Sequence, residues 1–178
     1  MKQFKLWNNM AGWLVFVISA ALYIYTAEPT ASLWDCGEYI ATALKLQVGH
    51  PPGAPFFQLT GRVFGFWAET SNGEAARMIN YMSALSSAFT ILFLFWSISL
   101  LLRKIIEPKN GHHSSIILIS SFIGSISYAF TDSFWFSAVE GEVYAMSSLF
   151  TAAVFWAILK WDEASDNDKY ADRWLLLI

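Results

Sequence analysis

Two carboxylates and a histidine stand close together in the first third of the sequence. Asp35 and Glu38 are spaced so that both side chains lie on one face of a helix, and His50 stands directly before Pro51 and Pro52. A carboxylate can take a proton from a hydroxyl, and an imidazole can orient a carboxylate or polarise a phosphate. Asp35 and Glu38 are therefore the first candidate catalytic residues, and His50 is a candidate substrate-binding residue.

Each of these residues also has a purely structural interpretation. Residues Ser32 to Asp35 fit the S-x-x-D capping box, in which Asp35 only satisfies backbone N–H groups at a helix start. A lone histidine such as His50 often packs or hydrogen-bonds locally. Arg62 can bind a phosphate bidentately, or it can lie along an apolar surface with its charge in water. The pattern leaves these alternatives open.

A second group of candidate binding residues lies near residue 140. Glu140 and Glu142 precede a long apolar run, and Tyr144 stands at its start. Two carboxylates at this spacing can bind a cation or a sugar hydroxyl; alternatively, they interact with the dipole of the following helix. The sequence has no Cys/His zinc constellation, P-loop, G-x-S-x-G or G-x-G-x-x-G. We therefore assign no metal ligand and expect no cofactor.

The composition places these candidates in a membrane protein. Of the 178 residues, 56% are hydrophobic and 14% are charged, whereas soluble domains carry about 25% charged residues. Spanning a bilayer takes an apolar run of about 20 residues, so we expect about four spanning helices and a lipid bilayer as partner. The net charge of −3 gives no reason to expect nucleic acid, and the single Cys36 excludes an internal disulfide.

The expected spanning helices can be placed along the chain. They cover about 10–26, 78–102, 115–130 and 143–161, and a fifth begins near residue 174. Because the chain stops inside this last apolar run, we expect it to be the N-terminal part of a longer protein.

Lysine and arginine predict the orientation, because cytoplasmic loops carry more of them. If four helices alternate, one side receives Lys2, Lys5, Arg103, Lys104, Lys109, Lys160, Lys169 and Arg173. The other side receives Lys45, Arg62 and Arg77, spread over a long loop. The N-terminus is therefore expected in the cytoplasm and residues 27–77 outside. The acidic run Asp162, Glu163, Asp166, Asp168 and Asp172 weighs little in this rule and is expected to be a solvated loop.

The long outer loop has helical patterns of its own. Residues 33–48 carry an apolar stripe from Leu33 to Val48 and a second stripe of Asp35, Glu38, Thr42 and Lys45, with Gly49 as a natural stop. The run His50-Pro51-Pro52-Gly53-Ala54-Pro55 breaks this helix. Residues 56–69 form a second helical stretch that we place in the membrane interface, and residues 71–74 read as a turn.

Three sequence blocks resemble a known family. They are Trp34-Asp35-Cys36-Gly37-Glu38, Val48-Gly49-His50-Pro51-Pro52-Gly53-Ala54-Pro55 and Val139-Glu140-Gly141-Glu142-Val143-Tyr144. The first two are similar to the N-terminal signature of a bacterial membrane family known as domain of unknown function 2723, and the third to its second block. That family is related to the transmembrane protein 260 O-mannosyltransferases.

The resemblance implies a GT-C glycosyltransferase architecture in the bacterial inner membrane, with spanning helices and interfacial helices in the first extracytoplasmic loop. Such enzymes move a sugar from a polyprenyl-phosphate donor to an extracytoplasmic acceptor, here expected to be Ser or Thr hydroxyls of proteins, or a glycan. Asp35 would be the general base, and Glu38, His50, Glu140, Glu142 and Tyr144 further site residues; Arg62 is assigned from charge and position only. A transporter component and a non-catalytic assembly subunit are the rival functions.

Overall fold

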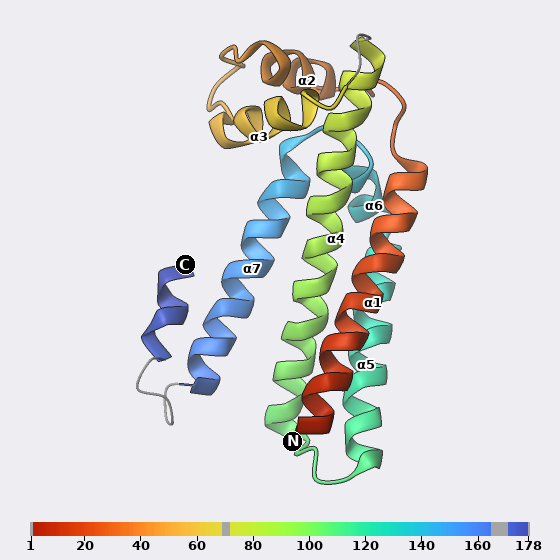
Figure 1. The fold of residues 1–178 in the computed structure, drawn as a ribbon, viewed down its shortest axis with the longest axis vertical. Coiled ribbons are helices and arrows are strands. Elements are labelled where there is room, and N and C mark those ends of the chain that lie inside the picture. The colour runs from red at the N-terminus through yellow and green to blue at the C-terminus, as the bar shows by residue number, and fades with distance from the viewer. Residues whose placement is uncertain (1, 69–71, 165–170, 178) are drawn as a thin grey trace. The chain divides into compact units, whose positions relative to one another are not determined.

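The computed structural model describes residues 2–68, 72–164 and 171–177. Every regular element among these residues is a helix, as predicted (Figure 1). The elements are α1 (Lys2–Thr26), α2 (Cys36–Lys45), α3 (Pro55–Gly65), α4 (Asn72–Ile105), α5 (Gly111–Ala129), α6 (Asp132–Ala138), α7 (Val143–Ala164) and the 3₁₀ helix η1 (Ala171–Leu177).

The long helices fit the expected membrane spans. Helix α1, residues Glu74–Ile105 of α4, and helix α7 are each long and apolar enough to cross a membrane. Helix α5 passes the same test only when it is taken together with α6, as one broken span. The described residues therefore hold three spans, or four with the broken pair, which confirms an all-α membrane fold.

Some boundaries differ from those that the sequence predicted. Helix α1 already begins at Lys2, and α4 extends beyond 78–102 at both ends, because an α-helix can continue past the apolar run that crosses the bilayer. The loop expected at 131–142 contains the short helix α6. At the C-terminal end, η1 occupies the place where a fifth helix was expected to begin.

The acidic run is only partly described. Asp162 and Glu163 belong to α7, where they pair with Lys104 and with Arg103, so the expectation of a solvated loop is wrong for both. Asp166 and Asp168 lie outside the described residues. So do Ser71 of the expected turn and Glu69 of the expected interfacial stretch.

The chain divides into two compact units. The first comprises Met1–Ser19, Phe89–Phe130 and Leu149–Ile178. Within it, the Trp96 ring packs against the rings of Trp13, Phe93 and Trp156. The Nη1 atom of Arg103 also lies 2.8 Å from Glu163 Oε1. These contacts join the described parts of α1, α4 and α7 that belong to this unit.

The second unit, Ala20–Ala88 and Thr131–Ser148, holds all the candidate site residues. Helices α2 and α3 pack against each other there. A Cβ at Gly61 of α3 would lie 3.0 Å from the Ala43 Cβ of α2, so a larger residue at this position would push the two helices apart. The buried core of the unit comprises Cys36, Ile40, Ala43, Phe57, Ala76, Ile79, Met82 and Met146.

Helix α2 is shorter than predicted, and its faces are shifted. It ends at Lys45, before Gly49, because Leu46 adopts a left-handed conformation with φ of 49° and donates its N–H back to the helix. The predicted apolar residues Leu33 and Val48 are exposed, whereas Thr42 of the predicted polar stripe is buried. The Thr42 hydroxyl instead donates to the carbonyl oxygen of Glu38 at 2.8 Å.

Candidate functional site

Glu38 and His50 form the best-defined polar pair of the site. The backbone N–H of His50 donates to Glu38 Oε1 at 2.7 Å, and His50 Nδ1 lies 3.0 Å from Glu38 Oε2. The backbone hydrogen bond, followed by the imidazole contact, lowers the pKa of Glu38. The same side-chain contact raises the pKa of His50. Both oxygens of Glu38 therefore serve to hold His50 and the turn that follows it.

Asp35 stands at the N-cap position of α2 but does not act as a cap. Its side chain makes no cap hydrogen bond with a described N–H group of the helix. The Ser32 hydroxyl, which the capping box would place at the helix start, donates to Glu140 Oε2 instead. The capping-box interpretation is therefore wrong, and the Asp35 carboxylate, whose side chain is 60% exposed, is accessible to solvent.

The imidazole of His50 faces Asp35 on its other side. His50 Nε2 lies 3.9 Å from Asp35 Oδ2, while Nδ1 faces Glu38. The ring of Tyr39 lies 6.0 Å from the imidazole, centroid to centroid. Burial, together with the charge of Asp35, raises the pKa of Tyr39. The structure thus brings Asp35, Glu38 and His50, which the sequence singled out, into one cluster.

Glu140 and Glu142 precede α7 and are both buried, with 3% and 6% of their surface exposed. Burial raises the pKa of Glu140, and the hydrogen bond from Ser32 partly opposes this rise. Burial also raises the pKa of Glu142, and the charges of Glu140 and Asp35 add to the effect. The negative charges of Glu142 and Asp35 therefore act on each other, although the two residues are far apart in sequence.

Asn80 of α4 is hydrogen-bonded to the backbone segment that precedes α2. Its Nδ2 donates to the carbonyl oxygens of Glu28 at 2.7 Å and Thr30 at 2.9 Å. The N–H of Glu28 in turn donates to the carbonyl oxygen of Val139 at 2.9 Å. A Cβ at Gly141 would lie 2.9 Å from Asn80 Oδ1, so only glycine lets the Glu140–Glu142 segment pass so close. Sequence reasoning missed Asn80; an amide inside an apolar run was the available signal.

Arg62 and Tyr144 have surroundings that the pattern did not predict. Arg62 Nη1 donates to the carbonyl oxygen of Leu44 at 2.7 Å, and its guanidinium lies over the Phe66 ring. These contacts bind the C-terminal end of α2 to α3. Tyr144, in the first turn of α7, is 60% exposed. Tyr144 is one of the groups that raise the pKa of Tyr39, whose ring lies beside the imidazole of His50.

Trp34 is a further residue that the sequence did not single out for chemistry. It directly precedes Asp35, and its φ of 61° lies in the left-handed region, which is costly for a bulky side chain. Its side chain is 86% exposed. Backbone strain of this kind is found most often at functional sites, and here it occurs at the residue before Asp35.

The comparisons with known proteins bear on this cluster. Residues 35–178 match the family described as "Protein O-mannosyl-transferase TMEM260 N-terminal domain". The chain belongs to this family. The match begins at Asp35 and includes the Glu38–His50 pair and the Glu140–Glu142 segment.

Two curated relatives of the TMEM260 family can be compared with the chain. It is 27% identical over 139 residues to "Protein O-mannosyl-transferase tmem260" of Dictyostelium discoideum, covering 78% of the chain and 15% of that protein. It is also 27% identical over 155 residues to "Protein O-mannosyl-transferase TMEM260" of Mus musculus, covering 85% of the chain and 19% of that protein. The chain thus spans less than a fifth of either relative. No solved structure matches the chain.

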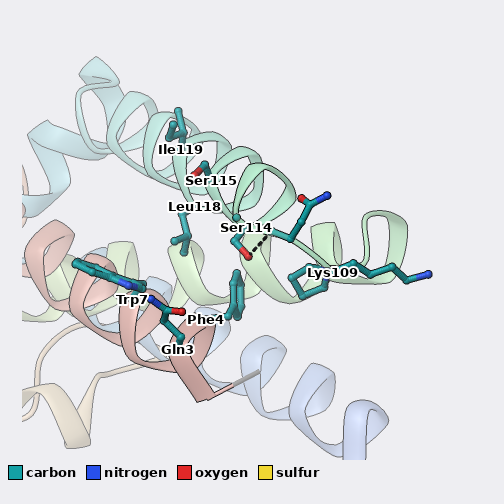
Figure 2. Close-up of a pocket in the computed structure, with 11 residues that line it drawn as sticks. Gln3, Phe4, Trp7, Lys109, Ser114, Ser115, Leu118 and Ile119 are labelled. Carbon is teal, nitrogen blue, oxygen red and sulfur yellow. Dashed lines mark hydrogen bonds between the residues drawn. The ribbon is translucent and has the colours of Figure 1, made fainter.

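A separate pocket of about 530 Å³ lies in the first unit of this TMEM260-family chain. Figure 2 shows Phe4 and Trp7 of α1 across from Leu118 and Ile119 of α5. Lys109 is also at the pocket, but its Nζ pairs with Glu107 at 2.8 Å. None of the residues that line this pocket is one of the candidate site residues.

Proposed function

We propose that this chain provides the acceptor-activating part of a membrane glycosyltransferase of the GT-C type. Its donor would be a sugar on a polyprenyl phosphate, and its acceptor a Ser or Thr hydroxyl of an extracytoplasmic protein. The observation that carries the proposal is the exposed, uncapped carboxylate of Asp35 beside a histidine that Glu38 holds in place. Membership of a family named for O-mannosyl transfer supports the same reaction class.

Asp35 is the proposed general base. The acceptor hydroxyl oxygen bonds to the anomeric carbon of the sugar while the bond from that carbon to the phosphate oxygen breaks. The polyprenyl phosphate leaves with the electron pair of that bond, and the hydroxyl proton passes to the Asp35 carboxylate. A base in this position typically contributes about 10²–10⁴-fold in rate.

The other residues receive supporting roles. Because both oxygens of Glu38 contact His50, Glu38 is proposed as a positioning residue. His50, which lies beside Asp35, is proposed as a substrate-binding residue on the side of the donor phosphate. Glu140, Glu142 and Tyr144 are proposed to bind substrate from the α7 side of the cluster. The contacts of Arg62 with Leu44 and Phe66 favour a structural role over phosphate binding.

A transporter component is the principal alternative. In such a protein, ionisable residues within the spans mark the transport path. Here Asp35, Glu38 and His50 lie between α1 and α4, outside the candidate spans. This placement favours chemistry at the membrane surface over passage through the bilayer.

Sugar transfer by the full-length protein tests the proposal. Purified and returned to lipid, the protein should consume a polyprenyl-phosphate-linked mannose and release polyprenyl phosphate as an acceptor peptide containing Ser and Thr gains the sugar. The same peptide with Ala in place of each Ser and Thr is the matched control. Consumption of donor without peptide glycosylation would reject the acceptor class. No consumption of any lipid-linked hexose would reject the proposed function.

The same proposal puts the loop from α1 to α4 outside the cytoplasm. Val48 is 93% exposed, whereas the native Cys36 is fully buried. A membrane-impermeant maleimide should therefore label Val48→Cys in sealed right-side-out vesicles and leave Cys36 unlabelled. His112→Cys, at an exposed position in the first turn of α5, should react only after the vesicles are opened. Mass spectrometry of the labelled peptides gives the readout; the reverse labelling pattern would refute the orientation.

A further inference from the structure

We propose that Asp35 and His50 bind a divalent metal ion, with Glu38 orienting the histidine. The ligand atoms of Asp35, Glu38 and His50 all lie within 4.8 Å of one another. The sequence pattern assigned no metal ligand, since only one of its three histidines, His50, lies near these carboxylates in the sequence and no motif spacing is present. The three residues become a ligand group only because the chain reverses after α2, at the left-handed Leu46, and so brings His50 back to that helix.

The spacing of His50 Nε2 and Asp35 Oδ2 suits a shared ion better than a direct contact. Their separation of 3.9 Å is too long for a hydrogen bond, which needs about 3.2 Å or less. Two ligands that bind one tetrahedral ion at about 2.1 Å lie about 3.4 Å apart, so the two atoms would approach each other by about 0.5 Å. An ion between the two atoms therefore requires little movement of either side chain.

Glu38 prepares His50 for this role. A histidine that binds a metal usually donates its other ring N–H to a carboxylate, which fixes the tautomer and the ring orientation. His50 Nδ1 lies 3.0 Å from Glu38 Oε2, so donation there leaves the Nε2 lone pair facing Asp35. The backbone N–H of His50 is bound to the other Glu38 oxygen at 2.7 Å, which makes the arrangement rigid.

Glu142 is the independent observation that points to a cation. It is 6% exposed, and among the described residues its carboxylate has no hydrogen-bond donor and no cationic partner. The charges that act on it are those of two further carboxylates, Glu140 and Asp35. A buried carboxylate without an opposite charge is costly, and a metal ion at Asp35 would supply that charge.

The mixed ligand set indicates the class of ion. Imidazole nitrogen with carboxylate oxygens suits a first-row dication such as Mn²⁺ or Zn²⁺. Binding through Oδ2 leaves the second oxygen of Asp35 free to take a proton. That the ion would offset negative charge on the donor phosphate rests on the proposed function, whereas the binding of the ion does not.

Mn²⁺ titration of the full-length protein, followed by electron paramagnetic resonance, tests the site directly. We expect one tightly bound Mn²⁺ that Zn²⁺ displaces, with electron spin echo modulation from a coordinated imidazole ¹⁴N. His50→Ala and Asp35→Asn should abolish this binding. Glu38→Gln should weaken it about 10- to 100-fold, the usual effect of losing the carboxylate that orients a metal-binding histidine. Glu142→Gln should weaken it as well.

Asp132→Asn is the matched control, because it removes an exposed carboxylate from another helix of the same unit and should leave binding unchanged. If His50→Ala folds poorly, His50→Gln replaces it. The absence of saturable binding by the wild-type protein, or binding that survives both His50→Gln and Asp35→Asn, would overturn the site. Sugar transfer by a wild-type protein that shows no saturable metal binding would overturn the site and leave the proposed function standing. Metal binding without sugar transfer would leave the site standing and overturn the proposed function.

Discussion

Asp35→Asn in the full-length protein should lower sugar transfer about 10²–10⁴-fold without lowering the amount of folded protein. Asparagine keeps the size of the side chain and removes its charge and basicity. The Asp35 side chain makes no described cap hydrogen bond and is 60% exposed, so the structural cost of the change should be small. Turnover at saturating donor and acceptor, divided by the folded fraction, is the measurement.

Asp132→Asn provides the matched control for Asp35→Asn. Asp132 is an exposed carboxylate in the first turn of α6, where its loss should cost only the helix-dipole interaction of about 0.3–1 kcal/mol. It should transfer sugar at the wild-type rate. A well-folded Asp35→Asn protein with near-normal turnover would remove Asp35 from catalysis.

The helical framework could be predicted from the sequence because a bilayer imposes a length and an apolar composition on each span. Three of the expected spans fall within α1, α4 and α7, and the fourth, 115–130, exceeds α5 by one residue. The ends of these helices could not be read in the same way, since polar residues can continue a helix beyond the apolar run. Helix α6, with seven residues, is too short to show a period and was read as loop.

The sequence periodicity predicted the wrong ends and the wrong faces for α2, because the helix is only ten residues long. The apolar pattern extends from Leu33 to Val48. In the structure, however, Leu33 precedes the helix and Val48 follows its left-handed end at Leu46. Both side chains are therefore free of the core. The position of Thr42 shows the other limitation: a hydroxyl that bonds to the Glu38 carbonyl can be buried at little cost, so it need not mark the solvent face.

The candidate site was predictable only where its residues are neighbours in sequence. Helical spacing placed Asp35 and Glu38 together, but the capping-box pattern assigned Ser32 to the wrong partner. Ser32 bonds instead to Glu140, which lies 108 residues away, and no local pattern encodes such a contact. Asn80 adds to this link, because its amide donates to the carbonyl oxygens of Glu28 and Thr30 and its Oδ1 lies close to Gly141.

Asn80→Ala should destabilise the second unit by about 1–3 kcal/mol, because it removes the two hydrogen bonds that the fully buried Asn80 amide donates to the carbonyl groups of Glu28 and Thr30. The Glu28–Ser32 segment would then lose its anchor on α4, and Cys36, which directly follows Asp35 and is fully buried, would become accessible more often. That energy corresponds to roughly 5- to 140-fold more of the open form. The rate at which a maleimide modifies Cys36, measured by mass spectrometry of its peptide, should rise accordingly.

Ser83→Ala separates this anchoring role from a general need for polar groups in α4. Ser83 lies one turn further along the helix, is 1% exposed, and its hydroxyl has no hydrogen-bond partner among the described residues. Replacing an unpartnered hydroxyl should be close to neutral, so Cys36 should react at the wild-type rate. An equal increase in the rate of Cys36 modification in both variants would mean that any substitution at these buried positions of α4 exposes Cys36. An unchanged rate in Asn80→Ala would show that the segment before α2 is held by other contacts, such as those of Ser32 with Glu140 and of Glu28 with Val139.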